Sequence, residues 1–130
     1  MLFSADWMRA FAAAWNSEPA LKGELERIGF TSNIAYGLMG EDEPRGVLVV
    51  ADGAAVGGGS FDGQPLDWDL RAAETTWRDW LARPPGMLVL GAAYTSGKLK
   101  ILAGDYAAMV KDPRMAGPFV KRFQVMGRVK

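Results

Sequence analysis

The chain has no cysteine and no histidine. Their absence excludes disulfides, thiol chemistry, Cys/His zinc sites and nucleophiles that a histidine activates. The longest mainly apolar run, residues 87–94, is far shorter than the roughly 20 residues that a membrane-spanning helix requires. The N-terminal residues also lack the basic start of a signal peptide. We therefore expect a cytoplasmic protein.

The composition is otherwise that of a globular domain. The 130 residues are 49% hydrophobic and 23% charged, which predicts one domain over residues 1–130 with a core of its own. Five Trp, six Phe and three Tyr are joined by seven Met. Such rigid rings and adaptable thioethers suit an apolar ligand cavity, although each residue taken alone is more often part of an ordinary core.

Charge is uneven along a chain whose net charge is zero. Residues 1–97 carry 13 acidic and 7 basic side chains, whereas residues 98–130 carry 2 and 8. A basic C-terminal third suits transient contact with an anionic membrane surface or an acidic partner. The alternative is that the two parts neutralise each other within the fold or across a homodimer. We predict no nucleic-acid partner.

Hydrophobic periodicity predicts helices and strands in a definite order. The predicted helices are residues 4–16, 19–28, 74–83, 105–111 and 118–126, and the predicted strands are residues 32–39, 47–50, 54–61, 66–71 and 98–102. Residues 87–94 fit a buried strand and a buried helix equally well. Four strands in succession predict an antiparallel meander. The whole order predicts an α+β fold with helices over one face of the sheet.

Two groups of residues resemble reactive sites, but a structural role is favoured for both. The Gly-Gly-Gly-Ser run at 57–60 lacks the Lys-Ser/Thr pair and the helix start of a phosphate-binding loop, so we expect a bulge or a close backbone approach. Asp67 and Asp69 share a strand face near Asp62, and such carboxylates can bind Mg²⁺ or transfer protons. We expect solvated charges on the open side of the sheet. We predict no catalytic residue, no cofactor and no metal site.

Most of the chain, about residues 34–110, resembles a known family. The residues that carry the resemblance are the alternating run Leu66-Asp67-Trp68-Asp69-Leu70, the helix with Trp77, Trp80 and Leu81, and above all Gly97-Lys98-Leu99-Lys100-Ile101 followed by the corner Gly104-Asp105 and the helix Tyr106–Val110. This order of elements resembles the sterol carrier protein type 2 family, which is a sterol-binding or lipid-transfer domain.

The resemblance implies a five-stranded, largely antiparallel sheet with helices packed on one face, enclosing an apolar tunnel. It favours a helix for residues 87–94. It implies a non-catalytic carrier that binds a sterol, a fatty acid or a fatty acyl-CoA, with transfer as a further role. The alternative is an interaction or dimerisation module of the same fold without a lipid. The candidate ligand-binding residues are Trp7, Phe11, Trp15, Trp68, Trp77, Trp80, Met87, Leu90, Tyr94, Leu99, Ile101, Met109, Phe119, Phe123 and Met126.

The last predicted helix, residues 118–126, admits two interpretations. Phe119, Phe123 and Met126 form an apolar stripe, and the basic residues, Arg122 among them, are placed elsewhere on the helix. The helix is then either a lid over the tunnel that meets a membrane surface, or a helix packed on the core. The sequence leaves both open.

Overall fold

The computed structural model describes residues 1–129, and Lys130, one of the basic residues counted above, lies outside them. The helices are α1 (Ala5–Asn16), the π-helical turn η1 (Pro19–Gly23), α2 (Glu24–Arg27), α3 (Glu74–Ala82), α4 (Met87–Ser96), α5 (Tyr106–Lys111) and α6 (Pro113–Met126). The strands are β1 (Ser32–Leu38), β2 (Gly46–Ala51), β3 (Ala54–Ser60), β4 (Trp68–Ala72) and β5 (Leu99–Ala103). Among the described helices, none is long and apolar enough to cross a membrane. The α+β class and the helix at residues 87–94 are confirmed.

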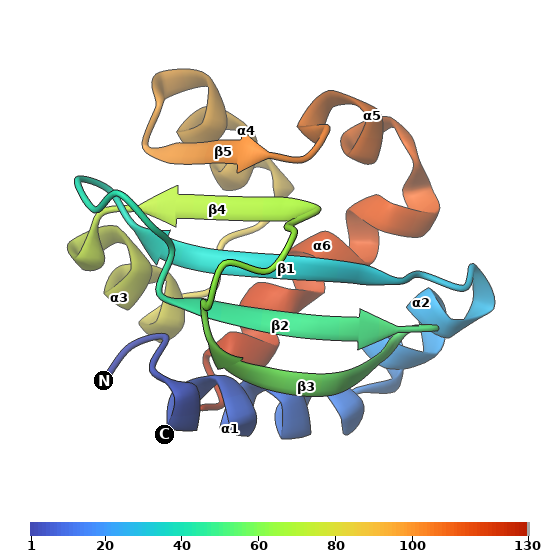
Figure 1. Cartoon of the computed structure of the whole chain (residues 1–130). Helices are drawn as coiled ribbons and strands as arrows, with labels where there is room; N and C mark the ends of the chain where they lie inside the picture. Colours follow the sequence, from blue (N-terminus) through green and yellow to red (C-terminus); the bar gives the residue numbers. More distant parts are fainter. Residues whose placement is uncertain (130) are drawn as a thin grey trace.

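The five strands form one sheet in the order β3-β2-β1-β4-β5. Strand β4 lies parallel to β1, and every other pair is antiparallel. The predicted four-stranded meander is therefore wrong at its fourth strand. The loop after β3 crosses the face of the sheet instead of turning back (Figure 1). Asn33 holds this loop, because its side chain donates to the Pro65 carbonyl and its backbone N–H donates to the Asp67 carboxylate.

The helices cover one face of the sheet, which we call the inner face (Figure 1). Helix α1 packs on β3, where a side chain at Gly58 would meet the Met8 carbonyl oxygen at 2.5 Å. The strand pair also carries a bulge between Val49 and Val50. Both features confirm the structural interpretation of the glycine run. The inner face and the helices share one hydrophobic core that includes Tyr36 and Leu70.

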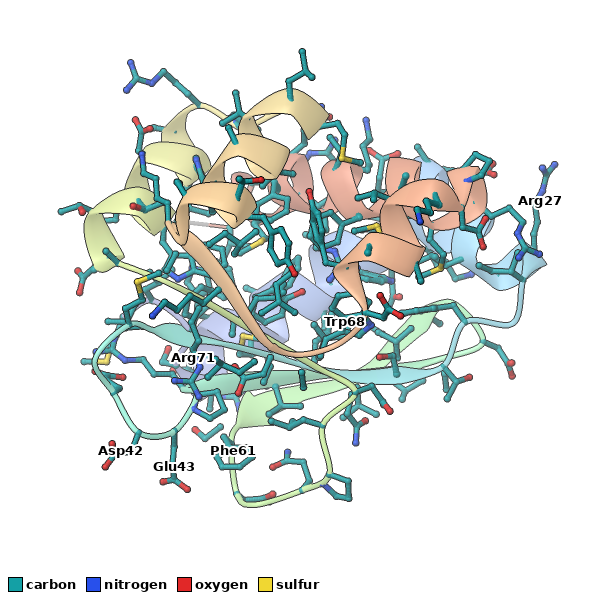
Figure 2. The ribbon with its side chains drawn as sticks, turned by 90° about the horizontal axis from the view of Figure 1, so that it is seen from above. Arg27, Asp42, Glu43, Phe61, Trp68 and Arg71 are labelled. Atoms are coloured by element: carbon teal, nitrogen blue, oxygen red, sulfur yellow. The ribbon has the colours of Figure 1, made fainter. Side chains whose placement is uncertain are left out.

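The opposite, outer face carries a buried ion pair. Asp69 is 7% exposed and Arg71 4% exposed, and the guanidinium donates two hydrogen bonds to the carboxylate at 2.7 and 3.0 Å. Arg71 also donates to the Glu41 carbonyl, in the loop that joins β1 to β2. In Figure 2 Arg71 lies beside this loop, whose residues Asp42 and Glu43 are labelled. The expectation of a solvated Asp69 is wrong, because the loop covers this part of the face.

Helix α6 begins five residues before the expected start. Asp112 caps it by accepting from the Arg114 backbone N–H, and Pro113 fits the first turn, where the missing N–H costs nothing. Pro118, the predicted first residue, lies inside the helix and is buried. Its ring removes one helical hydrogen bond, which the packing of the long apolar face offsets. The end at Gly127 is as predicted.

Candidate functional site

The space between the sheet and the helices contains most of the candidate ligand-binding residues. Trp7, Trp68, Met87 and Ile101 are half-buried, Tyr94 is exposed, and the fully buried candidates are Phe11, Trp15, Trp77, Trp80, Leu90, Leu99, Met109, Phe119, Phe123 and Met126. The buried ones belong to a single core cluster, against which Trp7, Trp68 and Ile101 also pack. The structure brings these thirteen residues together, whereas Met87 and Tyr94 lie outside the cluster.

Aromatic rings touch one another through this interior without interruption. Trp80 meets Phe123 edge to face, with ring centroids 5.7 Å apart, and Phe123 meets Phe119 at 5.6 Å. Trp77 packs on Tyr36 and also donates its indole N–H to the Gly37 carbonyl. The rings come from α3, α6 and β1, so the cluster joins the helices to the centre of the sheet. Helix α6 is thus packed on the core, which is the second of its two interpretations.

Helix α4 is apolar on all sides, yet only part of it is buried. Leu90 and Ala93 face the core, whereas Leu88 is 90% exposed and Val89 is 53% exposed. A cleft of about 340 Å³ runs along this helix. Its lining is mainly apolar and consists of Trp80, Val89, Ala92, Ala93, Ser96 and Lys98. Trp80 therefore lines the cleft and also belongs to the aromatic interior.

A pair of tyrosines joins α4 to α5. The rings of Tyr94 and Tyr106 stack with centroids 4.2 Å apart, and Tyr106 also meets Phe119 edge to face. Burial, followed by the neighbouring Tyr94, raises the pKa of Tyr106. Asp105 fixes the position of Tyr106, because its side chain accepts from the Ala108 N–H and caps α5. The stack therefore holds the first turn of α5 against α4.

The sequence interpretation missed one residue of this region, Arg122. The sequence pattern places it away from the apolar stripe of α6, but in the structure it is only 3% exposed. Its guanidinium lies 5.0 Å from the ring centre of Phe119 and 5.6 Å from that of Trp15. Helical spacing indicates its position, since Arg122 falls three residues after Phe119 and four before Met126 and therefore shares their face of the helix. A basic side chain on such a stripe is usually assigned to the solvated side.

The carboxylates considered for chemistry do not converge. Asp69 is paired with Arg71, while Asp67 accepts from the Asn33 backbone at 2.8 Å. Asp62 is exposed in the loop after β3. Across residues 1–129, no three His, Cys, Asp or Glu side chains gather in a group fit to hold a metal ion. The structure thus offers an apolar interior and an apolar cleft as its candidate site.

The five-stranded sheet with one parallel pair and helices on one face is similar in fold to sterol carrier proteins of known structure. The crystal structure of sterol carrier protein 2 matches all of this chain over all of its own length, with a TM-score of 0.78 and 21% identity. A conserved hypothetical protein from Thermus thermophilus, itself suggested to be a sterol carrier protein, matches with a TM-score of 0.65 and 20% identity. That match covers 97% of this chain and 90% of the other.

A third solved structure, the UbiJ-SCP2 ubiquinone synthesis protein, matches with a TM-score of 0.56 and 15% identity over 92% of this chain and 86% of its own. No protein-family model matches the chain, and no curated protein matches it. At these identities the three likenesses show the fold. They confirm the resemblance that rested chiefly on residues 97–105.

Proposed function

We propose that this protein binds a long-chain lipid non-covalently between the inner face of its sheet and its helices. The fold supports the proposal, because it is that of sterol carrier protein 2 over the full chain. The observation that carries it furthest is the apolar cleft along α4, which shares Trp80 with the aromatic interior. The proposal includes no covalent step, so binding alone is the activity.

The size and lining of the cleft suit an alkyl chain. Small-molecule sites have volumes of roughly 300 to 1,000 Å³, so 340 Å³ is sufficient for part of a lipid. Each methylene group that leaves water contributes about 0.8 kcal/mol. The rest of the chain then extends past Trp80 toward Phe123 and Phe119, whose side chains separate to form the apolar tunnel. In this proposal, the candidate residues that lie in the core cluster line the tunnel and contact the ligand.

Lipid extraction followed by a binding titration tests this proposal. We expect a lipid in the organic extract of the natively purified protein and its mass in native mass spectrometry. After delipidation, the protein should bind cis-parinaric acid, an 18-carbon fluorescent fatty acid, or the fluorescent sterol dehydroergosterol. The absence of a bound lipid together with the failure of both probes would refute the proposal.

A matched pair of variants locates the site. Ala92 is exposed and lines the cleft, so Ala92→Phe should fill it without disturbing the core. Excluding about two methylene groups from the cleft should weaken probe binding roughly tenfold. Ala13 is exposed on α1, so Ala13→Phe makes the same change outside the cleft and should leave binding unchanged. Equal affinities of the two variants would place the ligand elsewhere.

A second candidate function is an interaction or dimerisation module, and the exposed side chains of α4 favour it. Leu88 and Val89 project from this helix, and Leu102 is exposed on the edge strand β5. Equilibrium sedimentation of the wild type and of Leu88→Ser distinguishes the two candidates. If Leu88→Ser dissociates a dimer of the wild type, and neither protein binds a probe, the result supports the interaction module.

A separate experiment tests the membrane contact expected of the basic C-terminal third. The wild type should co-sediment with anionic vesicles, and Lys98→Ala at the cleft should reduce this co-sedimentation.

A further inference from the structure

Arg122 is a buried cation without a counter-charge. It lies on α6 between the Trp15 and Phe119 rings, and no carboxylate within residues 1–129 forms an ion pair with it. Its Nε is buried and has no hydrogen-bond partner among the described residues. The two rings offset part of the cost of burying the charge, but an isolated cation in an apolar interior is expensive. A negatively charged group beside the guanidinium would compensate its charge.

A second hydrogen-bond donor lies beside the guanidinium. One terminal nitrogen of Arg122 donates to the Tyr36 hydroxyl oxygen at 3.3 Å. With that oxygen accepting, the hydroxyl proton of Tyr36 is free to donate to another group, and it donates to none of residues 1–129. A tyrosine hydroxyl is protonated at neutral pH, and burial raises the pKa of Tyr36 further despite the neighbouring Arg122. Arg122 Nε and the Tyr36 hydroxyl are therefore two available donors at one buried place.

We propose that Arg122, together with Tyr36, binds the carboxylate of a fatty acid. This inference rests on the proposed function and names its ligand class. An ionised carboxylate has two oxygens, which accept from the Arg122 fork and from the Tyr36 hydroxyl. The side chains between the cleft and this site are apolar and packed against one another, since Trp80 contacts Phe123, Phe123 contacts Phe119, and Phe119 contacts Arg122. The lipid chain therefore reaches Arg122 by separating these rings.

The position of Arg122 decides among the lipids that the fold admits. A sterol offers one neutral hydroxyl, which leaves the guanidinium charge uncompensated. A fatty acyl-CoA has a bulky polar head that needs water, whereas Arg122 is 3% exposed and lies among aromatic rings. A free carboxylate neutralises the charge and needs little space. The ligand class is therefore a long-chain monocarboxylic acid.

The test compares cis-parinaric acid with its methyl ester, which has the same chain and no charge. The wild type should bind the acid more tightly than the ester. Arg122→Met should weaken acid binding about 10- to 100-fold, the loss expected for a hydrogen bond to a charged group, and leave ester binding unchanged. Lys121→Met is the matched control, because Lys121 is the neighbouring residue of α6 and bonds Gln124 at the surface, and this variant should bind both probes normally.

A structural role for Arg122 would give a different result. Replacing a buried, unpaired charge with an apolar residue should leave stability unchanged or raise it, so Arg122→Met should lose acid affinity without losing stability. If the variant does not fold, the NMR signal of palmitate labelled with ¹³C at its carboxyl, bound to the wild type, reports whether the carboxyl group is ionised. Its bound carboxyl signal should stay that of the ionised form below the ordinary carboxyl pKa.

Each outcome has one meaning. Equal affinity of the wild type for acid and ester, or acid affinity unaffected by Arg122→Met, overturns the carboxylate site while the proposed function stands. A bound palmitate that is protonated at its ordinary pKa or above also overturns it. Binding of neither probe, nor of dehydroergosterol, removes the proposed function as well.

Discussion

Removal of the Asp69 charge should destabilise the protein severely. In Asp69→Asn the shape of the side chain is kept, but Arg71 remains buried under the β1–β2 loop and loses the carboxylate with which it is paired. Breaking one side of a buried pair typically costs about 3 to 5 kcal/mol. A chain of 130 residues has a total stability of about 6 to 20 kcal/mol, so this single change removes a large share of it.

Urea unfolding, followed by tryptophan fluorescence, measures the effect. With an m-value of about 2 kcal/mol/M, the unfolding midpoint of Asp69→Asn should fall by about 2 M. The control is Arg78→Ala, which removes the exposed pair of Glu74 and Arg78 on α3. Exposed pairs contribute about 0 to 1 kcal/mol, so its midpoint should hardly move.

A double variant separates the charge from the packing. Asp69→Val combined with Arg71→Leu removes both charges and keeps apolar volume on the outer face, and such replacements are often neutral. It should therefore recover most of the midpoint lost by Asp69→Asn. If Asp69→Asn proves no more costly than Arg78→Ala, the ion pair is not desolvated and the reasoning is refuted.

Three further predictions concern packing, pH and capping. Gly58→Ala should lower the free energy of unfolding in urea by at least about 1 to 3 kcal/mol, because the new side chain meets the Met8 carbonyl. Gly59→Ala, where the new side chain has open space, should lower it far less. Equal losses in the two variants would contradict the contact. Burial raises the folded-state pKa of Tyr36, so above a pH of about 10 the unfolded chain loses a proton that the folded chain retains, and stability should fall by up to about 1.4 kcal/mol per pH unit. Alkaline urea titrations in which Tyr36→Phe shows the same slope would exclude this tyrosine as the cause. Asp105→Ala should lower stability by about 1 kcal/mol through the lost cap of α5, and an unchanged thermal midpoint would argue against the cap.

Local signals in the sequence predicted most of the elements. The first helix begins after Ser4 because the Ser4 side chain accepts from the Trp7 N–H, a pattern visible in the sequence. The conformation of the segment that carried the family resemblance is also determined by its own residues. Gly104 has a φ of 113°, a backbone conformation that favours glycine, so the residue type alone indicates the turn at this corner. Such features depend on residues close together in the chain.

Strand order could not be read in the same way. The position of β4 beside β1 depends on Asn33, which holds the loop after β3 through Pro65 and Asp67, more than 30 residues away. Alternation along residues 66–71 correctly separates the two faces of the strand, but it is the same whichever neighbour the strand has. It also cannot show that a loop covers the outer face. For that reason Asp69 was expected in solvent.

The two buried arginines show what the candidate site requires. On the outer face Arg71 has a carboxylate at 2.7 Å and a carbonyl at 2.9 Å, so the fold satisfies this charge from its own residues. On the inner face Arg122 has aromatic neighbours and, among residues 1–129, a single hydrogen bond at 3.3 Å. If Arg122 served the fold alone, a partner such as that of Arg71 would be expected. Its donors instead lie within the apolar layer, where a ligand that supplies the anion would also stabilise the folded state, by about 2.7 kcal/mol at a free concentration of 100 times its Kd. Palmitate should therefore raise the thermal midpoint of the wild type, whereas its methyl ester should raise it less, and this difference should disappear in Arg122→Met.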